Sequence, residues 1–424
     1  MLTRMERLIY AQNPWWEWSN WEARDRDLKN YSRASVRWVP SWLREISLKP
    51  FSLNIVVGPR QVGKTTGAKL LVSELVRTMD PRSVFYFSCD LAADARELRS
   101  ALDFYVRFKQ ANGIESSVII LDEVTGLEDW WRVVKGYVDL DLFERDVLVL
   151  MGSASFRLRR FAEAFPGRRG AGRTVEVLPL SFPEYLSVHG VEAKRGESRV
   201  LALFERYLAT GGYPRSVNGD EEFAGDLVAS VEKDAVKAGR DPKLLRMVAR
   251  EVLSKAPGAT SFNAIAGDLG VSHNTVHDYV RLMEDMFLVG VAYVRQGGRV
   301  LYRREKKIFF RDPFAARAFA ELLGTELSKA ALLEWVVQEH AYRRFGEVYF
   351  WRDGYEIDVI AGRCKIEVKT GKTHRRYPKG VLVLSEENVP FFLLDLQAGA
   401  CDERGCGEKG SSTGSREGAR GSAR

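Results

Sequence analysis

The chain has 424 residues, of which 45% are hydrophobic and 29% charged, a composition that excludes a wholly disordered protein and predicts about two to four domains. No apolar stretch approaches the ~20 residues of a membrane span and the N-terminus has no apolar signal region, so we expect a cytoplasmic protein without a membrane partner. The formal net charge of +7 permits nucleic-acid binding without requiring it.

Residues 1–50 form a tryptophan-rich arm. Six of the chain's ten tryptophans lie in it: Trp15, Trp16, Trp18, Trp21, Trp38 and Trp42. Indole rings combine a large apolar surface with one polar N–H group. We therefore expect the arm to pack onto the domain that follows.

Residues 51–178 alternate between short apolar segments and helical stretches. The predicted strands are rich in β-branched residues, as buried parallel strands are, and span 53–57, 84–88, 118–121, 147–151 and 174–178. Helices are predicted between them over 65–79, 95–112 and 129–140. This βαβα order predicts an α/β fold with a doubly wound parallel sheet.

A phosphate-binding loop follows the first predicted strand. Its sequence G-P-R-Q-V-G-K-T satisfies G-x-x-x-x-G-K-[ST] at every fixed position, in the strand-to-helix setting that this motif requires. Backbone N–H groups and the helix N-terminus attract phosphate, Lys64 is expected to reach the β- and γ-phosphates, and Thr65 to ligate Mg²⁺. The predicted ATP-binding residues are Gly58, Pro59, Arg60, Gln61, Val62, Gly63, Lys64, Thr65 and Thr66. A nucleotide site also gives the tryptophan arm a second interpretation, in which one ring lines the adenine pocket.

Polar residues end two further predicted strands. Asp122 and Glu123 follow the strand at 118–121; we expect Asp122 to hold Mg²⁺ through water and Glu123 to polarise the attacking water. Ser153 follows the strand at 147–151. It either senses the γ-phosphate from between the other two strands or forms a polar turn.

Arg168 and Arg173 lie in the glycine-rich segment 167–173, between the last two predicted strands. In one interpretation they supply an arginine finger to the nucleotide of a neighbouring copy, which requires a homo-oligomer. In the other they form a solvated basic loop.

The combination of these motifs resembles the AAA+ ATPases, notably a prokaryotic and archaeal branch with a G-P-R-Q-V-G-K-T loop. The L-D-E strand end, Gly152–Ser153 and P-L-S-F-P-E-Y at 179–185 carry the resemblance, which extends to about residue 396. It implies an AAA+ core over 51–178 that binds ATP with Mg²⁺, followed by a helical lid over 179–257 that is broken by a turn at 211–214.

A winged helix is predicted over 258–312. Residues 268–276 have the pattern of a helix, a glycine turn at Gly270 and a second helix capped by Ser272. His273, Asn274 and His277 are expected to face outward from the second helix, and a wing follows at 295–299. Nearby Arg303, Arg304, Lys306 and Lys307 add positive charge. The module either contacts DNA or joins two domains by packing.

A hairpin with facing carboxylates is predicted in the mixed α/β region 313–397. A turn at Gly362–Arg363 pairs Ala361 with Cys364, and the same register sets Asp358 opposite Glu367 with Lys369 on that face. The arrangement resembles the PD-(D/E)XK nuclease fold, which implies a second metal site of Glu334, Asp358, Glu367 and Lys369. The alternative is a solvated hairpin face with cross-strand ion pairs, in which Lys369 lies opposite Glu356.

The tail over 398–424 is rich in glycine and poor in apolar residues, and we expect it to be disordered. The four cysteines, Cys89, Cys364, Cys401 and Cys406, are too few and too scattered for a disulfide framework or a zinc site.

The sequence thus predicts an Mg²⁺-dependent ATPase whose work is coupled to nucleic-acid binding or processing through the winged helix and the nuclease-like domain. The alternative is a regulatory switch in which ATP controls a protein partner and the nuclease-like domain is an inactive scaffold. Salt-sensitive DNA binding favours the first hypothesis. ATPase activity that responds to a protein partner and not to DNA favours the second.

Overall fold

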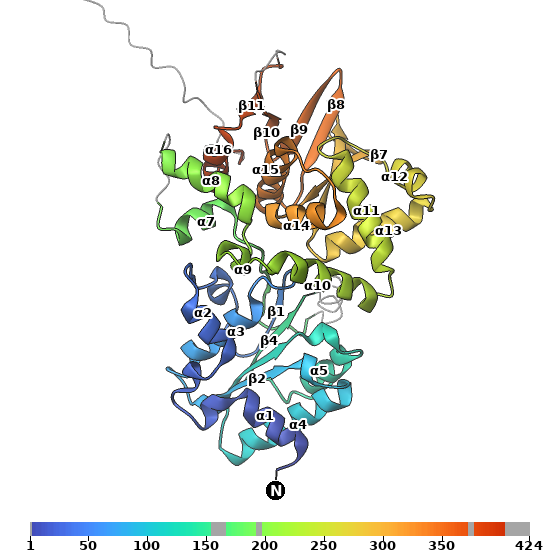
Figure 1. Cartoon of the computed structure of the whole chain (residues 1–424). Coiled ribbons are helices and arrows are strands. Elements are labelled where there is room, and N and C mark those ends of the chain that lie inside the picture. The colour runs from blue at the N-terminus through green and yellow to red at the C-terminus, as the bar shows by residue number, and fades with distance from the viewer. Residues whose placement is uncertain (1, 154–166, 192–196, 372–376, 403–424) are drawn as a thin grey trace, which may run out of the picture.

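The computed structural model describes residues 2–153, 167–191, 197–371 and 377–402. They form two α/β parts, one around a five-stranded sheet and one around a six-stranded sheet. Figure 1 shows the first in the lower half of the view and the second in the upper half, with helices α9 (Pro214–Val217) and α10 (Phe223–Lys237) between them.

The lower sheet is parallel throughout. Its strands are β1 (Ser52–Val57), β2 (Val84–Ser88), β3 (Val118–Asp122), β4 (Val147–Gly152) and β5 (Thr174–Glu176), in the order β2-β3-β4-β1-β5. Each of the five predicted strands is present, with ends within two residues of the prediction. Because β4 lies between β1 and β3, the carboxyl ends of these three strands meet at one edge.

Helices cover both faces of this sheet, which explains why β1, β3 and β4 are buried along their whole length. On one face lie α1 (Arg4–Gln12), α4 (Ala95–Ala111) and α5 (Trp130–Asp139). On the other lie α2 (Arg26–Arg33) and α3 (Lys64–Leu75). Neighbouring residues of one strand accordingly join different cores: Ile55 packs with the first set and Val56 with the second.

The tryptophan arm covers the open edge of β2. The indole N–H groups of Trp15 and Trp16 both donate to the carbonyl oxygen of Val84, at 2.9 and 3.0 Å. The side-chain amide of Asn13 donates to the Tyr86 carbonyl (2.9 Å) and accepts from the Tyr86 N–H (2.7 Å), as a neighbouring strand would. The arm therefore satisfies the edge strand and packs as predicted.

Helices α7 (Phe182–Val188), α8 (Ser198–Thr210), α9, α10 and α11 (Pro242–Lys255) follow the first sheet. The predicted break at 211–214 is the turn between α8 and α9. No helix in the described part of the chain is long and apolar enough to cross a membrane.

The upper sheet combines strands from two segments that the sequence analysis assigned to separate domains, with a boundary after residue 312. It has the order β11-β10-β9-β8-β6-β7. Its strands are β6 (Val289–Gln296), β7 (Arg299–Phe310), β8 (Tyr349–Asp353), β9 (Tyr355–Ala361), β10 (Cys364–Lys369) and β11 (Val381–Ser385). The helices beside it are α12 (Phe262–Leu269), α13 (His273–Asp285), α14 (Pro313–Leu323), α15 (Lys329–Phe345) and α16 (Val389–Gln397). The boundary drawn at 312 thus runs through one sheet.

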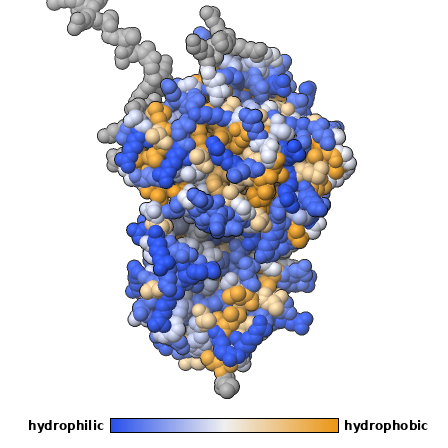
Figure 2. Space-filling view, viewed as in Figure 1, coloured by the Kyte–Doolittle hydropathy of each residue, from blue (hydrophilic) through white to orange (hydrophobic). Residues whose placement is uncertain are grey.

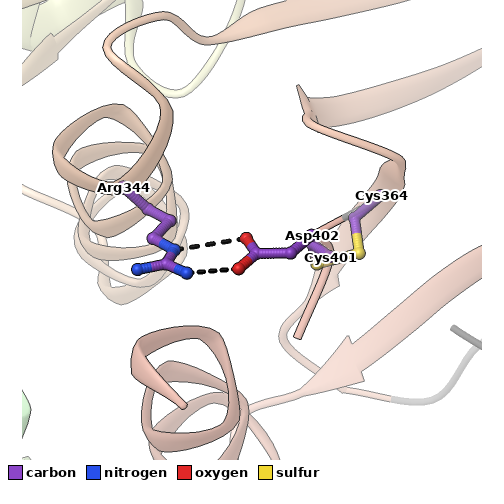
Figure 3. The surroundings of a disulfide bond; sticks show 4 residues. All are labelled: Arg344, Cys364, Cys401 and Asp402. Atoms are coloured by element: carbon purple, nitrogen blue, oxygen red, sulfur yellow. Dashed lines mark hydrogen bonds and ion pairs between the residues drawn. A yellow bond between two sulfur atoms is a disulfide. The ribbon is translucent and has the colours of Figure 1, made fainter. Parts of the chain in front are cut away.

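A disulfide bond between Cys364 and Cys401 fastens the start of the tail to the β9–β10 turn (Figure 3). Beside it the guanidinium of Arg344 binds the carboxylate of Asp402 (Figure 3). The argument that the cysteines are too few and too scattered for a disulfide framework did not anticipate this single bond, because the fold brings together two cysteines that are 37 residues apart. The expectation of disorder was wrong for 398–402, where Cys401 is buried, and the rest of that tail lies outside the described residues.

Candidate nucleotide site and C-terminal carboxylate cluster

The phosphate loop lies between β1 and α3, as predicted, and its glycines are required by its shape. Gly63 has a φ of +92°, a left-handed conformation that side chains disfavour. A Cβ on Gly58 would lie 2.0 Å from the carbonyl oxygen of Val177, so only glycine lets the two backbones approach. The loop is therefore a tight turn whose backbone leads directly into a helix N-terminus.

Lys64 is buried at the first turn of α3, with its side chain folded back over the loop. Its Nζ donates to the carbonyl oxygens of Gly58 (2.9 Å) and Pro59 (2.8 Å). Burial lowers the pKa of this ammonium, and the nearby carboxylates of Glu123 and Asp122 partly offset that effect. The charge of Lys64 is thus held inside the loop, where the prediction places a phosphate.

Thr65 and Asp122 are brought together by the ends of β1 and β3. The hydroxyl of Thr65 donates to Oδ2 of Asp122 at 2.7 Å, and Tyr86 donates to the same oxygen at 2.9 Å. Burial and the neighbouring Glu123 raise the pKa of Asp122, although the two hydroxyl groups counteract them. A hydroxyl beside a buried carboxylate is an oxygen donor set that fits a hard cation such as Mg²⁺.

Tyr86 is a functional candidate that the sequence analysis missed. It lies in the middle of β2, paired with Ile120 of the neighbouring strand. The available signal was a tyrosine hydroxyl at the centre of a largely apolar strand, next to the strand that ends in Asp122.

Glu123 and Ser153 meet at the same sheet edge. The Ser153 hydroxyl donates to Oε2 of Glu123 at 3.2 Å, because β4 ends between β1 and β3. Glu123 has a φ of +51°, an uncommon conformation for a residue with a side chain. Such backbone strain is concentrated at functional sites, because the surrounding structure must hold it in place.

The helical region contacts the phosphate loop from the opposite side. Arg60 donates through Nε to Asp234 of α10 at 2.7 Å, and Arg215 of α9 donates to Oε1 of Gln61 at 2.8 Å. Arg60 and Gln61, predicted as nucleotide-binding residues, therefore use their side chains to connect the loop to α9 and α10. Arg215 was not predicted, and its only sequence signal is its place directly after the glycine turn.

A cavity of about 550 Å³ opens beside the loop. Its walls come from the loop and α3, from Glu123, from the arm and from the start of α9; the arm residues include Tyr31, Arg33, Arg37 and Trp38. Trp15, Trp21 and Trp42 are buried in packing, as expected, whereas Trp38 lines the cavity. That one ring contacts adenine stays a prediction. Figure 2 shows the molecule narrowing to a waist between its two parts.

Arg168 and Arg173 lie away from the phosphate loop of their own chain. Arg168 donates to Asp139 at 2.5 Å. Arg173 precedes β5 and lies level with Asn54, about 10 Å short of the end of β1 at ~3.3 Å per residue. A finger role for either residue therefore needs a second copy of the chain, and it stays a prediction.

Helices α12 and α13 and the β6–β7 hairpin have the order predicted for a winged helix. Ser272 caps α13 by accepting from the Thr275 N–H at 3.0 Å. The exposed residues on α13 and the hairpin include His273, Asn274, His277, Arg299, Arg303 and Arg304. The expectation that Lys306 and Lys307 add surface charge was wrong, because both are buried.

Lys307 lies at the centre of a carboxylate cluster. Its Nζ is 2.8 Å from Glu334 of α15, 2.8 Å from Glu356 and 2.7 Å from Asp358 of β9. Burial by itself lowers the pKa of Lys307, but the three carboxylates outweigh it and raise that pKa. Burial raises the pKa of Glu334, as does the charge of Asp358. Sequence analysis placed Glu334 and Asp358 together but missed Lys307 and gave Glu356 a different partner.

Glu367 and Lys369 form a separate pair. Lys369 binds Oε1 of Glu367, which also accepts from the Tyr377 hydroxyl at 2.9 Å. Oε2 of Glu367 is buried without a hydrogen-bond partner among the described residues, and burial and the charge of Asp358 raise the pKa of this group. The cross-strand pair between Lys369 and Glu356 is wrong, since Glu356 binds Lys307.

The predicted hairpin register is confirmed over three pairs, from Ala361 with Cys364 to Val359 with Ile366. Beyond them, Oδ2 of Asp358 accepts the backbone N–H of Val368 at 2.9 Å. Within the described residues, no group of three or more histidine, cysteine or acidic side chains is arranged to hold a metal ion.

Comparison with known proteins agrees with the first site. A family model described as "AAA domain" matches residues 51–186, and one described as "Domain of unknown function (DUF8612)" matches residues 201–326. The phosphate loop and the acids that end β3 both lie within the matched residues, so residues 51–186 are similar to an AAA-type P-loop domain. The second match covers much of the helical region and the β6–β7 hairpin without assigning them an activity.

The chain is 22% identical over 268 residues to an uncharacterized protein, MJ1544, of Methanocaldococcus jannaschii, and it spans only 57% of that relative's length. Among solved structures, it is similar to the ORC2 protein of Aeropyrum pernix (14% identity, TM-score 0.39, 64% of this chain and 88% of the other). It is also similar to Cdc6p of Pyrobaculum aerophilum (13% identity, TM-score 0.30, 73% and 95%).

Proposed function

We propose that the chain binds ATP with Mg²⁺ and hydrolyses it at the edge where β1, β3 and β4 end. The observation that carries the proposal is the meeting of three strand ends: Thr65 with Asp122 and Glu123 with Ser153, beside the phosphate loop. A chance glycine turn would not bring all of these groups to one sheet edge.

Each residue has a distinct role in this proposal. The loop backbone and Lys64 bind the β- and γ-phosphates, with Lys64 exchanging its two loop carbonyls for phosphate oxygens. Thr65 and Asp122 hold Mg²⁺, which supplies positive charge that offsets the charge developing during phosphoryl transfer. Glu123 orients and polarises the attacking water, and Ser153 positions Glu123. Tyr86 keeps the Asp122 carboxylate in place.

The test is phosphate release from ATP by the full chain, with Glu123→Gln as the active-site variant. Glu128→Gln is the matched control, because this exposed acid lies five residues further along the chain. The proposal is supported if wild-type ATP turnover depends on Mg²⁺, and if this turnover is retained in Glu128→Gln but lost in Glu123→Gln. Equal turnover in both variants would remove Glu123 from the site.

For the work coupled to ATP, we propose DNA contact through α13 and the β6–β7 hairpin. Exposed His273 and Asn274 on α13 and Arg303 on β7 support it, because recognition helices use polar residues of their first turns and basic residues contact the DNA backbone. Salt-dependent DNA binding that weakens in Asn274→Ala, with ATP turnover raised by DNA, is the expected result. Unchanged binding in Asn274→Ala would exclude this face.

A second candidate is a regulatory switch that acts on a protein partner through an inactive nuclease-like scaffold. It is favoured by Lys307, which supplies an internal cation to the carboxylates that a nuclease would use for metal. DNA-independent turnover that changes with a protein partner would support the switch.

A further inference from the structure

The carboxylate cluster of the upper sheet is built around an ammonium group and does not fit a metal ion. Three oxygens, from Glu334, Glu356 and Asp358, surround Lys307 Nζ at 2.7–2.8 Å, which is the ordinary length of an N–H···O⁻ hydrogen bond. Magnesium needs oxygens at about 2.0–2.1 Å in an octahedral arrangement. The cluster therefore fits its own lysine better than the metal that a nuclease-like fold implies.

Charge gives the same answer. A buried carboxylate pair needs a compensating cation or a proton, since unpaired buried charge is costly. Lys307 meets this need from inside the chain, with its Nζ 5.7 Å from the centre of the Phe350 ring and its side chain only 4% exposed. Gln338 adds a hydrogen bond from Nε2 to Glu334 Oε1 at 3.0 Å.

The position of Lys307 in the sheet gives this ion cluster a mechanical role. The β6–β7 hairpin joins the rest of the sheet through β6 and β8, which pair over only two positions, Tyr293 with Tyr349 and Val294 with Phe350. Lys307 belongs to β7, while its partners belong to α15 and β9. Its side chain therefore crosses the narrow junction and connects the hairpin to the elements on the far side.

We propose that Lys307 is a built-in counter-ion that takes the place of a divalent metal in this cluster and fastens the β6–β7 hairpin to α15 and β9. The C-terminal region is then a metal-free scaffold that moves as one body with the hairpin. This inference deepens the switch candidate and does not use the nucleotide site, so it can fail while ATP hydrolysis stands.

The first experiment titrates the nucleotide-free full chain with Mn²⁺. Binding is measured from the electron paramagnetic resonance signal of the Mn²⁺ that remains free. Wild type and Asp358→Asn should bind the same amount of Mn²⁺, because Lys307 already occupies the cluster. Mn²⁺ binding in wild type that is lost in Asp358→Asn or Glu367→Gln would overturn the proposal. ATP hydrolysis is assayed on the same samples. Failure of the counter-ion proposal can therefore be distinguished from failure of the proposed ATPase activity.

The second experiment compares Lys307→Met with Lys306→Met in thermal unfolding. The two lysines are adjacent and similarly buried, but Lys306 Nζ donates to the Arg304 carbonyl and lies over the Phe262 ring. Lys307→Met should lower the unfolding midpoint by on the order of 10 °C more than the control, because it leaves buried carboxylates without a cation. If Lys307→Met does not fold while Lys306→Met does, the result supports the proposal in the same way.

Adding Asp358→Asn to Lys307→Met should recover part of the lost midpoint, since it removes one uncompensated charge. The proposal would be overturned if Lys307→Met lowered the unfolding midpoint no more than Lys306→Met does. It would also be overturned if the effects of Lys307→Met and Asp358→Asn on the midpoint were additive in the double variant.

Discussion

Each sheet of this chain carries a buried aspartate in an acidic cluster, Asp122 at the end of β3 and Asp358 within β9, and the partners of the two aspartates differ. Asp122 in the lower sheet receives hydroxyl groups from Thr65 and Tyr86 and lies beside a cavity. Asp358 in the upper sheet receives an ammonium group from Lys307. The first set leaves the carboxylate charge available to an added cation, and the second neutralises it. The comparison teaches that the partners of a carboxylate, rather than its motif, decide whether it can serve as a metal ligand.

The largest effect is expected at the lower cluster, from Lys64→Ala. This change removes the charge that faces the β- and γ-phosphates, where electrostatic stabilisation dominates phosphoryl transfer, so ATP turnover should fall to background. Phosphate release and nucleotide binding are the measurements. Arg77→Ala, an exposed residue just beyond α3, is the control and should keep wild-type turnover. Wild-type affinity and hydrolysis in Lys64→Ala would contradict the assignment of this loop.

Glu123→Gln should bind ATP but hydrolyse it about 100-fold more slowly, because an amide cannot polarise water as a carboxylate does. Turnover and nucleotide binding, measured separately, distinguish a chemical defect from a binding defect. A loss of less than about tenfold would mean that Glu123 is not the catalytic carboxylate, and the strained backbone at this residue would need another explanation.

An arginine supplied by a second copy of the chain would complete the lower cluster. If Arg173 acts across an interface, mixing Arg173→Ala with Lys64→Ala protein should restore partial turnover, since some interfaces then combine an intact loop with an intact arginine. Turnover is measured against oligomer size by chromatography. A strictly monomeric protein with full activity would exclude this role.

The sequence was sufficient for the lower sheet because its information is local. Strands of β-branched residues, a loop of fixed spacing and acids at a strand end predicted β1 to β5 and the meeting of Lys64, Thr65, Asp122 and Glu123 at one edge. Tyr86 escaped because its role depends on which strand neighbours β3.

The upper sheet was harder to predict because its decisive contacts join distant segments. The hairpin register was predictable from one turn, whereas Lys307 meets Asp358 across 51 residues and Cys364 meets Cys401 across 37. Lys306 and Lys307 sit in a run of charged residues that looks exposed, yet both are buried. Lys307 lies among carboxylates of α15 and β9, and Lys306 lies over the Phe262 ring of α12. Long-range pairing of this kind leaves no periodic signal in the chain.

A third buried carboxylate, Asp312, provides the smallest test of the comparison. It has neither a hydroxyl nor an ammonium partner of the kind seen in the two clusters; its oxygens accept the backbone N–H groups of Gly212 (2.8 Å), Phe314 (2.8 Å) and Ala315 (3.2 Å). Burial raises the pKa of Asp312 to about 6, against the partial compensation of these N–H groups. Backbone amides alone therefore hold this carboxylate less well than an ammonium group would.

A raised pKa in the folded state means that, between about pH 4 and 6, the native protein binds more protons than the unfolded chain. The contribution of Asp312 to the free energy of unfolding should therefore fall as pH rises through this window, by about 2–3 kcal/mol at most. Urea unfolding at several pH values gives the free energy of unfolding of wild type and of Asp312→Asn. The difference between the two isolates Asp312, because the effects of His340 and other titrating groups are the same in both proteins and cancel. The free energy of unfolding of wild type, relative to that of Asp312→Asn, should decrease as pH rises and level off above about pH 6. A difference that is flat, or that moves in favour of wild type, would mean that the three N–H groups stabilise the charged form of Asp312 enough to offset its burial.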